Sequence, residues 1–113
     1  MTGGDARMAK FMLTSTYTVE GINGLMKDGG TKRAEVIRAL IDNSGGRMEA
    51  LYFGFGQYDT YVVCDLPDHR TAIALATTIR AAGGLDTRVS PLLTPEDVDE
   101  ALRMQVAYQP PGA

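Results

Sequence analysis

Three pairs of adjacent glycines divide the middle of the chain and limit how long its helices can be. They are Gly29–Gly30, Gly45–Gly46 and Gly83–Gly84. Two adjacent glycines cost a helix interior roughly 2 kcal/mol relative to alanine, and glycine also adopts the left-handed conformation that ends many helices. The pairs therefore predict a break or loop at the first position and helix ends at the other two.

The segments between these breaks carry two different apolar periods. Residues 36–41 hold an apolar stripe of helical period, whereas residues 10–17 mix apolar and β-branched residues on two alternating faces, as a strand does. Applied along the chain, these signals predict strands at residues 10–17, 47–55, 58–66 and 85–93, and helices at residues 19–28, 31–44, 69–82 and 95–106.

Three of the predicted helices begin at good capping residues. Thr18, Asp68 and Thr94 each precede a helical segment, and Pro95 and Asp97 complete a strong helix start after Thr94. The first helix carries four apolar residues on one face: Val19, Ile22, Leu25 and Met26. The third helix is predicted to point its apolar face inward, with Ile73, Leu75, Ala76 and Ile79.

The order strand, helix, strand, strand, helix, strand is that of the split βαβ, or ferredoxin-like, arrangement. It predicts an α+β fold with a four-stranded antiparallel sheet, two long helices on one face and an extra C-terminal helix. We expect a single domain over residues 10–107, with tails at residues 1–9 and 108–113.

The second and third predicted strands do not alternate apolar and polar residues. "ALYFGF" and "YVVC" are apolar on both faces, whereas a sheet with one wet face should alternate. Both faces of these strands therefore need cover, and a second copy of the chain can provide it. This pattern predicts a homodimer or a higher even oligomer with sheets packed face to face.

The composition argues against several classes of partner and cofactor. The chain has 113 residues, 44% hydrophobic and 22% charged, with a net charge of −3 and scattered Lys and Arg, so we expect no nucleic-acid partner. No apolar run approaches the roughly 20 residues that span a bilayer, so we expect no membrane partner. Cys64 and His69 are the only residues of their kinds, which predicts a cytoplasmic protein with no metal and no cofactor.

The motif Gly56-Gln57-Tyr58-Asp59 lies between the second and third predicted strands. Its spacing predicts a tight hairpin in which Gly56 has a positive φ, with a bulge at Gly54. Asp59 is expected to accept backbone hydrogen bonds near the turn, and Tyr58 to pack across it. The motif is thus a turn first, and Tyr58 and Asp59 are candidates for the edge of a ligand pocket.

Two further groups of residues are candidates for ligand binding. Lys27 and Arg33 flank the first glycine pair, where backbone amides at a helix start can face an anion. Tyr17 ends the first strand, where a cleft would open, and with Tyr52 it could hydrogen-bond an enol or phenol. No catalytic residue is identified.

At these residues the chain resembles the GYD family of small bacterial and archaeal proteins, named for a Gly-x-Tyr-Asp type motif. "YTVEGINGLMKDGGTKRAEVIRALIDNSGGRMEALYFGFGQYD" resembles the first half of the family, and "DLPD" and "PLLTPEDVDEAL" resemble its later landmarks, over about residues 10–104. The resemblance implies the dimeric α/β-barrel superfold. It implies no established activity.

The sequence favours a small-molecule-binding protein with a cleft between sheet and helices in each protomer. The alternative is a cofactor-independent isomerase or monooxygenase that acts on a small carbonyl or phenolic compound, with Tyr17, Tyr52 and Lys27 orienting the substrate. Whether the chain is an enzyme stays open, because its only histidine follows a helix cap and is expected to be exposed.

Overall fold

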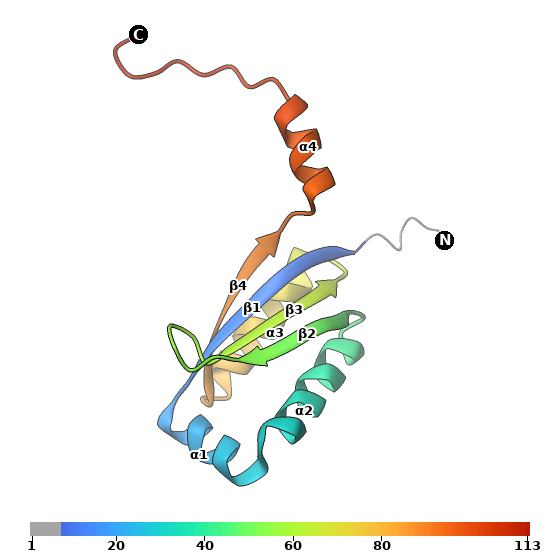
Figure 1. Ribbon diagram of the computed structural model, residues 1–113, viewed down its shortest axis with the longest axis vertical. Coiled ribbons are helices and arrows are strands. Elements are labelled where there is room, and N and C mark those ends of the chain that lie inside the picture. Colours follow the sequence, from blue (N-terminus) through green and yellow to red (C-terminus); the bar gives the residue numbers. More distant parts are fainter. Residues whose placement is uncertain (1–7) are drawn as a thin grey trace.

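The computed structural model describes residues 8–113 and has a single antiparallel sheet with the strand order β2-β3-β1-β4 (Figure 1). Each strand pairs with its neighbours over most of its length, and β1 lies at the centre between β3 and β4. The strands are β1 (Ala9–Tyr17), β2 (Arg47–Phe53), β3 (Thr60–Leu66) and β4 (Leu85–Leu92).

The helices connect the strands in the predicted order. They are α1 (Val19–Asp28), α2 (Gly30–Asn43), α3 (His69–Ala81) and α4 (Pro95–Arg103). In Figure 1, α3 lies behind the sheet, and α1 and α2 follow one another below and beside it. The α+β class and the four-stranded antiparallel sheet are therefore confirmed, in an arrangement compatible with a ferredoxin-like fold. Of the predicted tail at residues 1–9, residues 1–7 lie outside the described part, and Ala9 already belongs to β1.

The core lies between the sheet and α2 and α3. β3 shows the alternation most clearly, because Thr60, Val62, Cys64 and Leu66 are buried while the residues between them are half-buried. Phe11, Leu13, Ile41 and Leu75 complete the same cluster from β1 and the two helices. The apolar stripe of residues 36–41 on α2 needs an apolar surface to pack on, and this face of the sheet provides it.

Glycine and cap signals fixed the helix ends as predicted. Gly29, with φ 87° and ψ 164°, separates α1 from α2 in a conformation that only glycine adopts readily. Gly45 and Gly83 also have positive φ, of 84° and 88°, and follow α2 and α3. Thr18 and Asp68 accept hydrogen bonds from the backbone amides of Gly21 and Thr71, so both predicted caps are confirmed.

The apolar faces of α1 and α3 are buried only in part, so the inward face predicted for α3 is partly wrong. Val19 and Met26 on α1 are 78% and 79% exposed, and no residue of α1 is buried. Ile73 on α3 is 55% exposed, because the buried face of that helix is formed by Ala72, Leu75 and Ala76. The reason is that α1 lies at the end of the sheet and does not cover it, so Ile22 and Leu25 are only half-buried there.

The predicted tight hairpin at Gly56–Gln57 is also wrong. β2 ends at Phe53 and β3 begins at Thr60, so residues 54–59 form a longer loop. Phe55, with φ 56°, takes the left-handed conformation in this loop, and Gly56 does not have a positive φ. The register shift lies inside β2, between Met48 and Ala50, rather than at Gly54.

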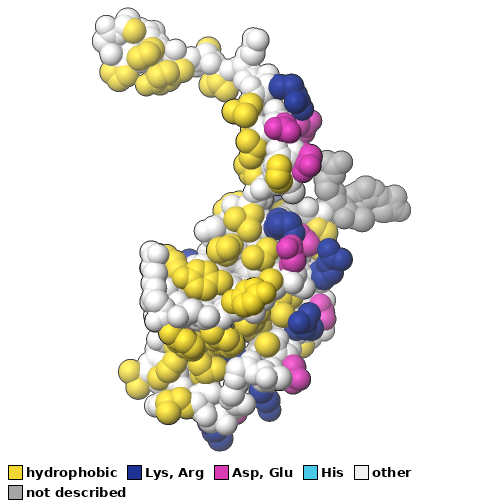
Figure 2. All heavy atoms as spheres, in the orientation of Figure 1, with side chains coloured by type: hydrophobic (Ala, Val, Ile, Leu, Met, Phe, Trp, Pro, Cys, Tyr) yellow, Lys and Arg dark blue, Asp and Glu magenta, His cyan; other side chains and the backbone are white. Residues whose placement is uncertain are grey.

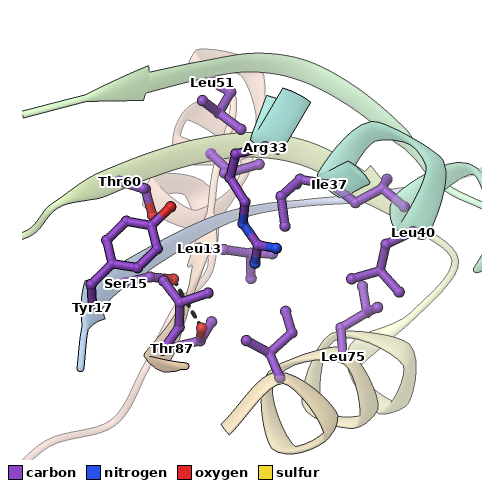
Figure 3. Close-up of a pocket in the computed structure, with 14 residues that line it drawn as sticks. Leu13, Ser15, Tyr17, Arg33, Ile37, Leu40, Leu51, Thr60, Leu75 and Thr87 are labelled. Atoms are coloured by element: carbon purple, nitrogen blue, oxygen red, sulfur yellow. Dashed lines mark hydrogen bonds between the residues drawn. The ribbon is translucent and has the colours of Figure 1, made fainter. Parts of the chain in front are cut away.

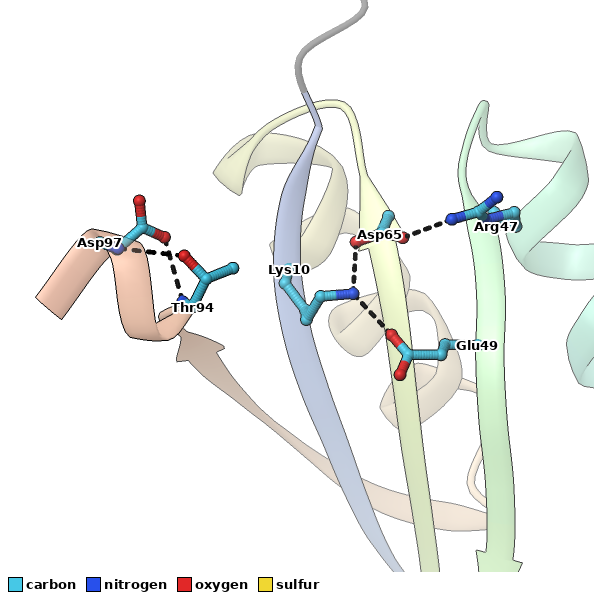
Figure 4. Close-up of polar contacts among 6 residues, drawn as sticks. All are labelled: Lys10, Arg47, Glu49, Asp65, Thr94 and Asp97. Carbon is cyan, nitrogen blue, oxygen red and sulfur yellow. Dashed lines mark hydrogen bonds and ion pairs between the residues drawn. The ribbon is translucent and has the colours of Figure 1, made fainter.

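The C-terminal helix extends away from the domain. α4 ends at Arg103, short of the predicted Val106, and projects from the end of β4 with the tail beyond it (Figure 1). Its start is as predicted, since Thr94 and Asp97 cap each other's backbone amides (Figure 4). None of the extensive contacts between described elements involves α4. No helix within residues 8–113 is long and apolar enough to cross a membrane.

The face of the sheet away from α3 is open. Figure 2 shows hydrophobic side chains gathered over the sheet and charged side chains along one side of it. Charged residues of β1, β2 and β3 form an ion network. Lys10 Nζ lies 2.6 Å from Glu49 and 2.9 Å from Asp65, and Arg47 lies 3.4 Å from Asp65 (Figure 4). The hydrogen bond to Glu49, with that to Asp65, raises the pKa of Lys10.

Candidate functional site

A small cavity and a larger cleft meet between the sheet and the helices. The cavity has a volume of about 20 Å³, enough for about one water molecule, and lies over β1 between α2 and α3 (Figure 3). The cleft has a volume of about 410 Å³ and is lined by residues of α1, α2 and the end of α3. The two share six lining residues, so they form one continuous pocket: Tyr17, Arg33, Ile37, Leu40, Ile79 and Leu85.

Tyr17 is the last residue of β1 and faces this pocket. Its place follows from the strand alternation, because Leu13, Ser15 and Tyr17 share one face of β1 and all three line the cavity. The Tyr17 hydroxyl oxygen is buried and has no hydrogen-bond partner within residues 8–113. A buried hydroxyl normally finds a partner, so this one marks a position where a ligand atom could bind.

Asp59 holds the backbone at Tyr17. Its carboxylate Oδ2 accepts a hydrogen bond of 2.8 Å from the Tyr17 amide, and its own amide donates to the Ser15 carbonyl at 2.8 Å. The prediction that Asp59 accepts a backbone hydrogen bond is therefore confirmed, with a donor on β1 rather than in the turn. Asp59 therefore holds the Tyr17 backbone in position from outside the pocket, which it does not line.

Arg33 reaches the pocket from the first turn of α2. Figure 3 shows its side chain extending into the space beside the Tyr17 ring. Arg33 is half-buried and forms no ion pair with any residue of 8–113, although Asp28 also lines the cleft. Burial raises the pKa of Tyr17, and Arg33 opposes that rise through its positive charge and through an approach of its guanidinium to the Tyr17 hydroxyl that falls short of hydrogen-bond geometry. Tyr17 is therefore a neutral hydrogen-bond donor at neutral pH.

The remaining wall of the pocket is mostly aliphatic. Ser15 and Thr87 are buried side by side and bond to each other, with 2.9 Å between their hydroxyl oxygens, so neither hydroxyl is left without a partner. Sequence reasoning did not select this pair or Thr60, although polar residues on the inner faces of β1 and β4 are the signal that identifies them. The aliphatic lining comes from Leu13, Leu25, Val36, Ile37, Leu40, Ile41, Leu51, Val62, Leu75, Ile79 and Leu85.

Three of the predicted site residues lie elsewhere. Lys27 is exposed on α1 and lines neither part of the pocket. Tyr52 is 72% exposed and pairs with Tyr61, so it lies on the opposite face of the sheet. Tyr58 packs edge-on against Tyr61, with ring centroids 6.0 Å apart, outside the pocket. Of the six predicted residues, the structure thus brings Tyr17 and Arg33 together and places Asp59 behind them.

The arrangement can bind but shows few groups that could move a proton. Tyr17, Arg33 and Asp28 are the ionisable residues among those that line the pocket. A neutral tyrosine and a guanidinium are both hydrogen-bond donors, and they meet where an apolar cleft narrows. This geometry suits a molecule with an apolar body and one acceptor group.

Comparison with known proteins places the chain in a family. Searches of curated proteins and of solved structures returned no match. The family model described as the GYD domain matches residues 11–102, which include all of the sheet except the first two residues of β1, the pocket and most of α4. Because this match spans most of the 113 residues, the chain belongs to the GYD domain family.

Proposed function

We propose that this protein binds a small, largely apolar molecule in the pocket between its sheet and helices. The observation that carries the proposal is the buried Tyr17 hydroxyl, which faces the pocket without a partner in residues 8–113. The volume of the cleft, about 410 Å³, lies in the range of small-ligand sites, and aliphatic side chains dominate its wall. The bound molecule would lie in the cleft and present one polar atom to Tyr17.

Gly24 offers a direct test. It lines the cleft from α1, on the same helical face as Gly21 and Asp28, and a Cβ atom at Gly24 would meet nothing within 4 Å. Gly24→Leu should therefore place a side chain in the cleft while improving helix propensity by roughly 0.8–1 kcal/mol. Asn23→Leu is the matched control, because Asn23 is exposed on the same helix and does not line the cleft.

The probe is a neutral molecule, 3-phenylpropan-1-ol, titrated into the full chain by ligand-observed NMR. We expect wild type and Asn23→Leu to bind it with a Kd on the order of 1 mM, and Gly24→Leu to lose binding. Equal binding by all three proteins, or none by wild type, would contradict a ligand site in the cleft.

A second candidate is a cofactor-independent isomerase or monooxygenase acting on a small carbonyl or phenolic compound. The observation that favours it is again Tyr17, since burial raises its pKa and keeps it protonated. A protonated Tyr17 could donate to a carbonyl oxygen and, with the Arg33 charge, polarise that carbonyl. Conversion of substrate that depends on Tyr17 would separate this candidate from simple binding.

We also propose the homodimer that the sequence predicts. Two apolar surfaces lack cover in the described chain: the open face of the sheet, including Tyr52, and the side of α4 that carries Val98 and Leu102. The family match reaches residue 102, so α4 is part of the domain although it hardly touches it. A second copy would cover both surfaces.

The buried Cys64 thiol is consistent with the cytoplasmic location we propose.

A further inference from the structure

The pocket contains a charge that no ion pair within residues 8–113 neutralises, and this feature goes beyond the size and apolarity of the ligand. Arg33 extends from α2 into an aliphatic space and forms no ion pair with residues 8–113. A half-buried guanidinium is costly unless an anion or several acceptors face it. Within residues 8–113 the acceptors near Arg33 include Asp28 at the cleft, the Tyr17 hydroxyl and Asp59 behind Tyr17, whose Oδ2 accepts from the Tyr17 amide.

The Tyr17 hydroxyl, the second hydrogen-bond donor in the pocket, lies beside Arg33. Tyr17 and Arg33 both line the cavity and the cleft, so they meet at the junction of the two. The hydroxyls of Ser15 and Thr87, which also line the cavity, bond to each other, and the Tyr17 hydroxyl bonds to neither of them. The junction therefore presents a neutral O–H and a cationic N–H fork, with aliphatic side chains around them.

We infer that the ligand carries a carboxylate, which binds Arg33 and Tyr17 at the junction while its small apolar body fills the cleft. A planar carboxylate offers two oxygens that match the guanidinium fork, and one oxygen can also accept from the Tyr17 hydroxyl. A single guanidinium balances the single charge of a carboxylate, whereas a phosphate dianion would need a second cation, and Lys27 does not line the pocket. This inference rests on the proposed function.

The test compares two molecules of the same size, 3-phenylpropionate and 3-phenylpropan-1-ol. Wild-type protein should bind the acid at least about tenfold more tightly than the alcohol, a difference of about 1.4 kcal/mol. Arg33→Gln should remove this preference, which is the ratio of the affinities for the acid and the alcohol. Arg33→Lys, which keeps the charge but not the fork, should give an intermediate preference. Arg38→Gln is the control, since Arg38 is exposed on the same helix and does not line the pocket.

The outcomes separate the two proposals. If wild type binds the alcohol but shows no preference for the acid, the carboxylate inference is overturned and the binding function stands. If neither molecule binds, the proposed function fails and the inference fails with it. Tighter binding of phenyl phosphate than of 3-phenylpropionate would overturn the assignment to a carboxylate, and so would an acid preference that survives Arg33→Gln.

Discussion

Tyr17 buries a hydroxyl that the described protein leaves without a hydrogen-bond partner, so its presence should cost stability. We expect Tyr17→Phe to raise the free energy of unfolding by about 1 kcal/mol, because the phenyl ring keeps the packing and the unpaired hydroxyl is gone. Urea denaturation measures this, with Tyr52→Phe as the control at a residue that is 72% exposed. The same Tyr17 variant should bind 3-phenylpropionate more weakly. A loss of stability in Tyr17→Phe would show that the hydroxyl has a partner.

Cys64 gives the protein a pH dependence on the alkaline side. Burial, with the charge of Asp65, raises the pKa of this thiol from 9.0 to about 11. The folded state therefore holds the proton more tightly than the unfolded state, and this contribution is complete below about pH 9 and is lost as the pH rises toward about 11. The free energy of unfolding should fall over that interval by on the order of 2–3 kcal/mol.

Urea denaturation at about pH 8 and about pH 10.5 measures the slope. Cys64→Ala should flatten it without abolishing it, because burial also raises the pKa of Tyr17 and gives a smaller slope of the same sign. If Cys64→Ala and wild type lost the same stability between the two pH values, the thiol would not be the group responsible.

A glycine substitution should destabilise the protein at the break between α1 and α2 but have little effect in the loop 54–59. Gly29 has a φ of 87° and a ψ of 164°, and nothing lies within 4 Å of a Cβ built there, so Gly29→Ala should cost about 1–3 kcal/mol through backbone strain alone. Gly56 has no positive φ and equally open surroundings, so Gly56→Ala should stay within about 0.5 kcal/mol of wild type. Thermal denaturation of the two variants compares them directly. The reverse order of stability would contradict this account.

The elements that the sequence predicted correctly are those set by local chemistry. The caps at Thr18 and Asp68 and the glycine after α2 act within a few residues, so a single segment contains the whole signal. The loop 54–59 could not be predicted in this way, because Asp59 is bonded to Ser15 and Tyr17 on β1, more than 40 residues away. Its length follows from that distant pairing and not from the motif itself.

The same distinction applies to the candidate site. Tyr17 and Arg33 could each be selected from the sequence, one at a strand end and the other after a glycine pair. Their meeting depends on how α2 crosses the sheet, which is tertiary packing. Tyr52 was misplaced because a strand that is apolar on both faces does not reveal which side faces the helices, and a shift of one residue changes the face.

α4 should contribute little to the stability of its own domain. It begins after Leu92 and has no extensive contact with the other described elements. Removing residues 93–113 should therefore change the free energy of unfolding of the monomer by less than about 1 kcal/mol. Circular dichroism in urea, at a protein concentration where the full chain is monomeric, measures this. A loss above about 2 kcal/mol would mean that α4 packs on the sheet in solution.

At the scale of the whole molecule, the open face of the sheet predicts assembly. A face-to-face dimer should bury more than about 1,200 Å² in total, and sedimentation equilibrium at micromolar concentration should give twice 12.1 kDa. Val63 lies on the open face between Met12 and Ala50, so Val63→Asp should give a folded monomer. Ala74→Asp is the control, because Ala74 is exposed on α3, on the other side of the sheet. A wild-type protein that sediments at 12.1 kDa would contradict the dimer.

The projecting α4 also affects how the size of this protein must be measured. The chain has a radius of gyration of 17.3 Å and extents of 57 × 45 × 23 Å, whereas a compact chain of this length would have a radius of gyration of about 13 Å. An elongated particle experiences more friction than a sphere of equal mass. A monomer of this shape would leave a sizing column early and could be taken for a dimer. Elution volume alone therefore cannot count protomers here, whereas sedimentation equilibrium reports mass independently of shape.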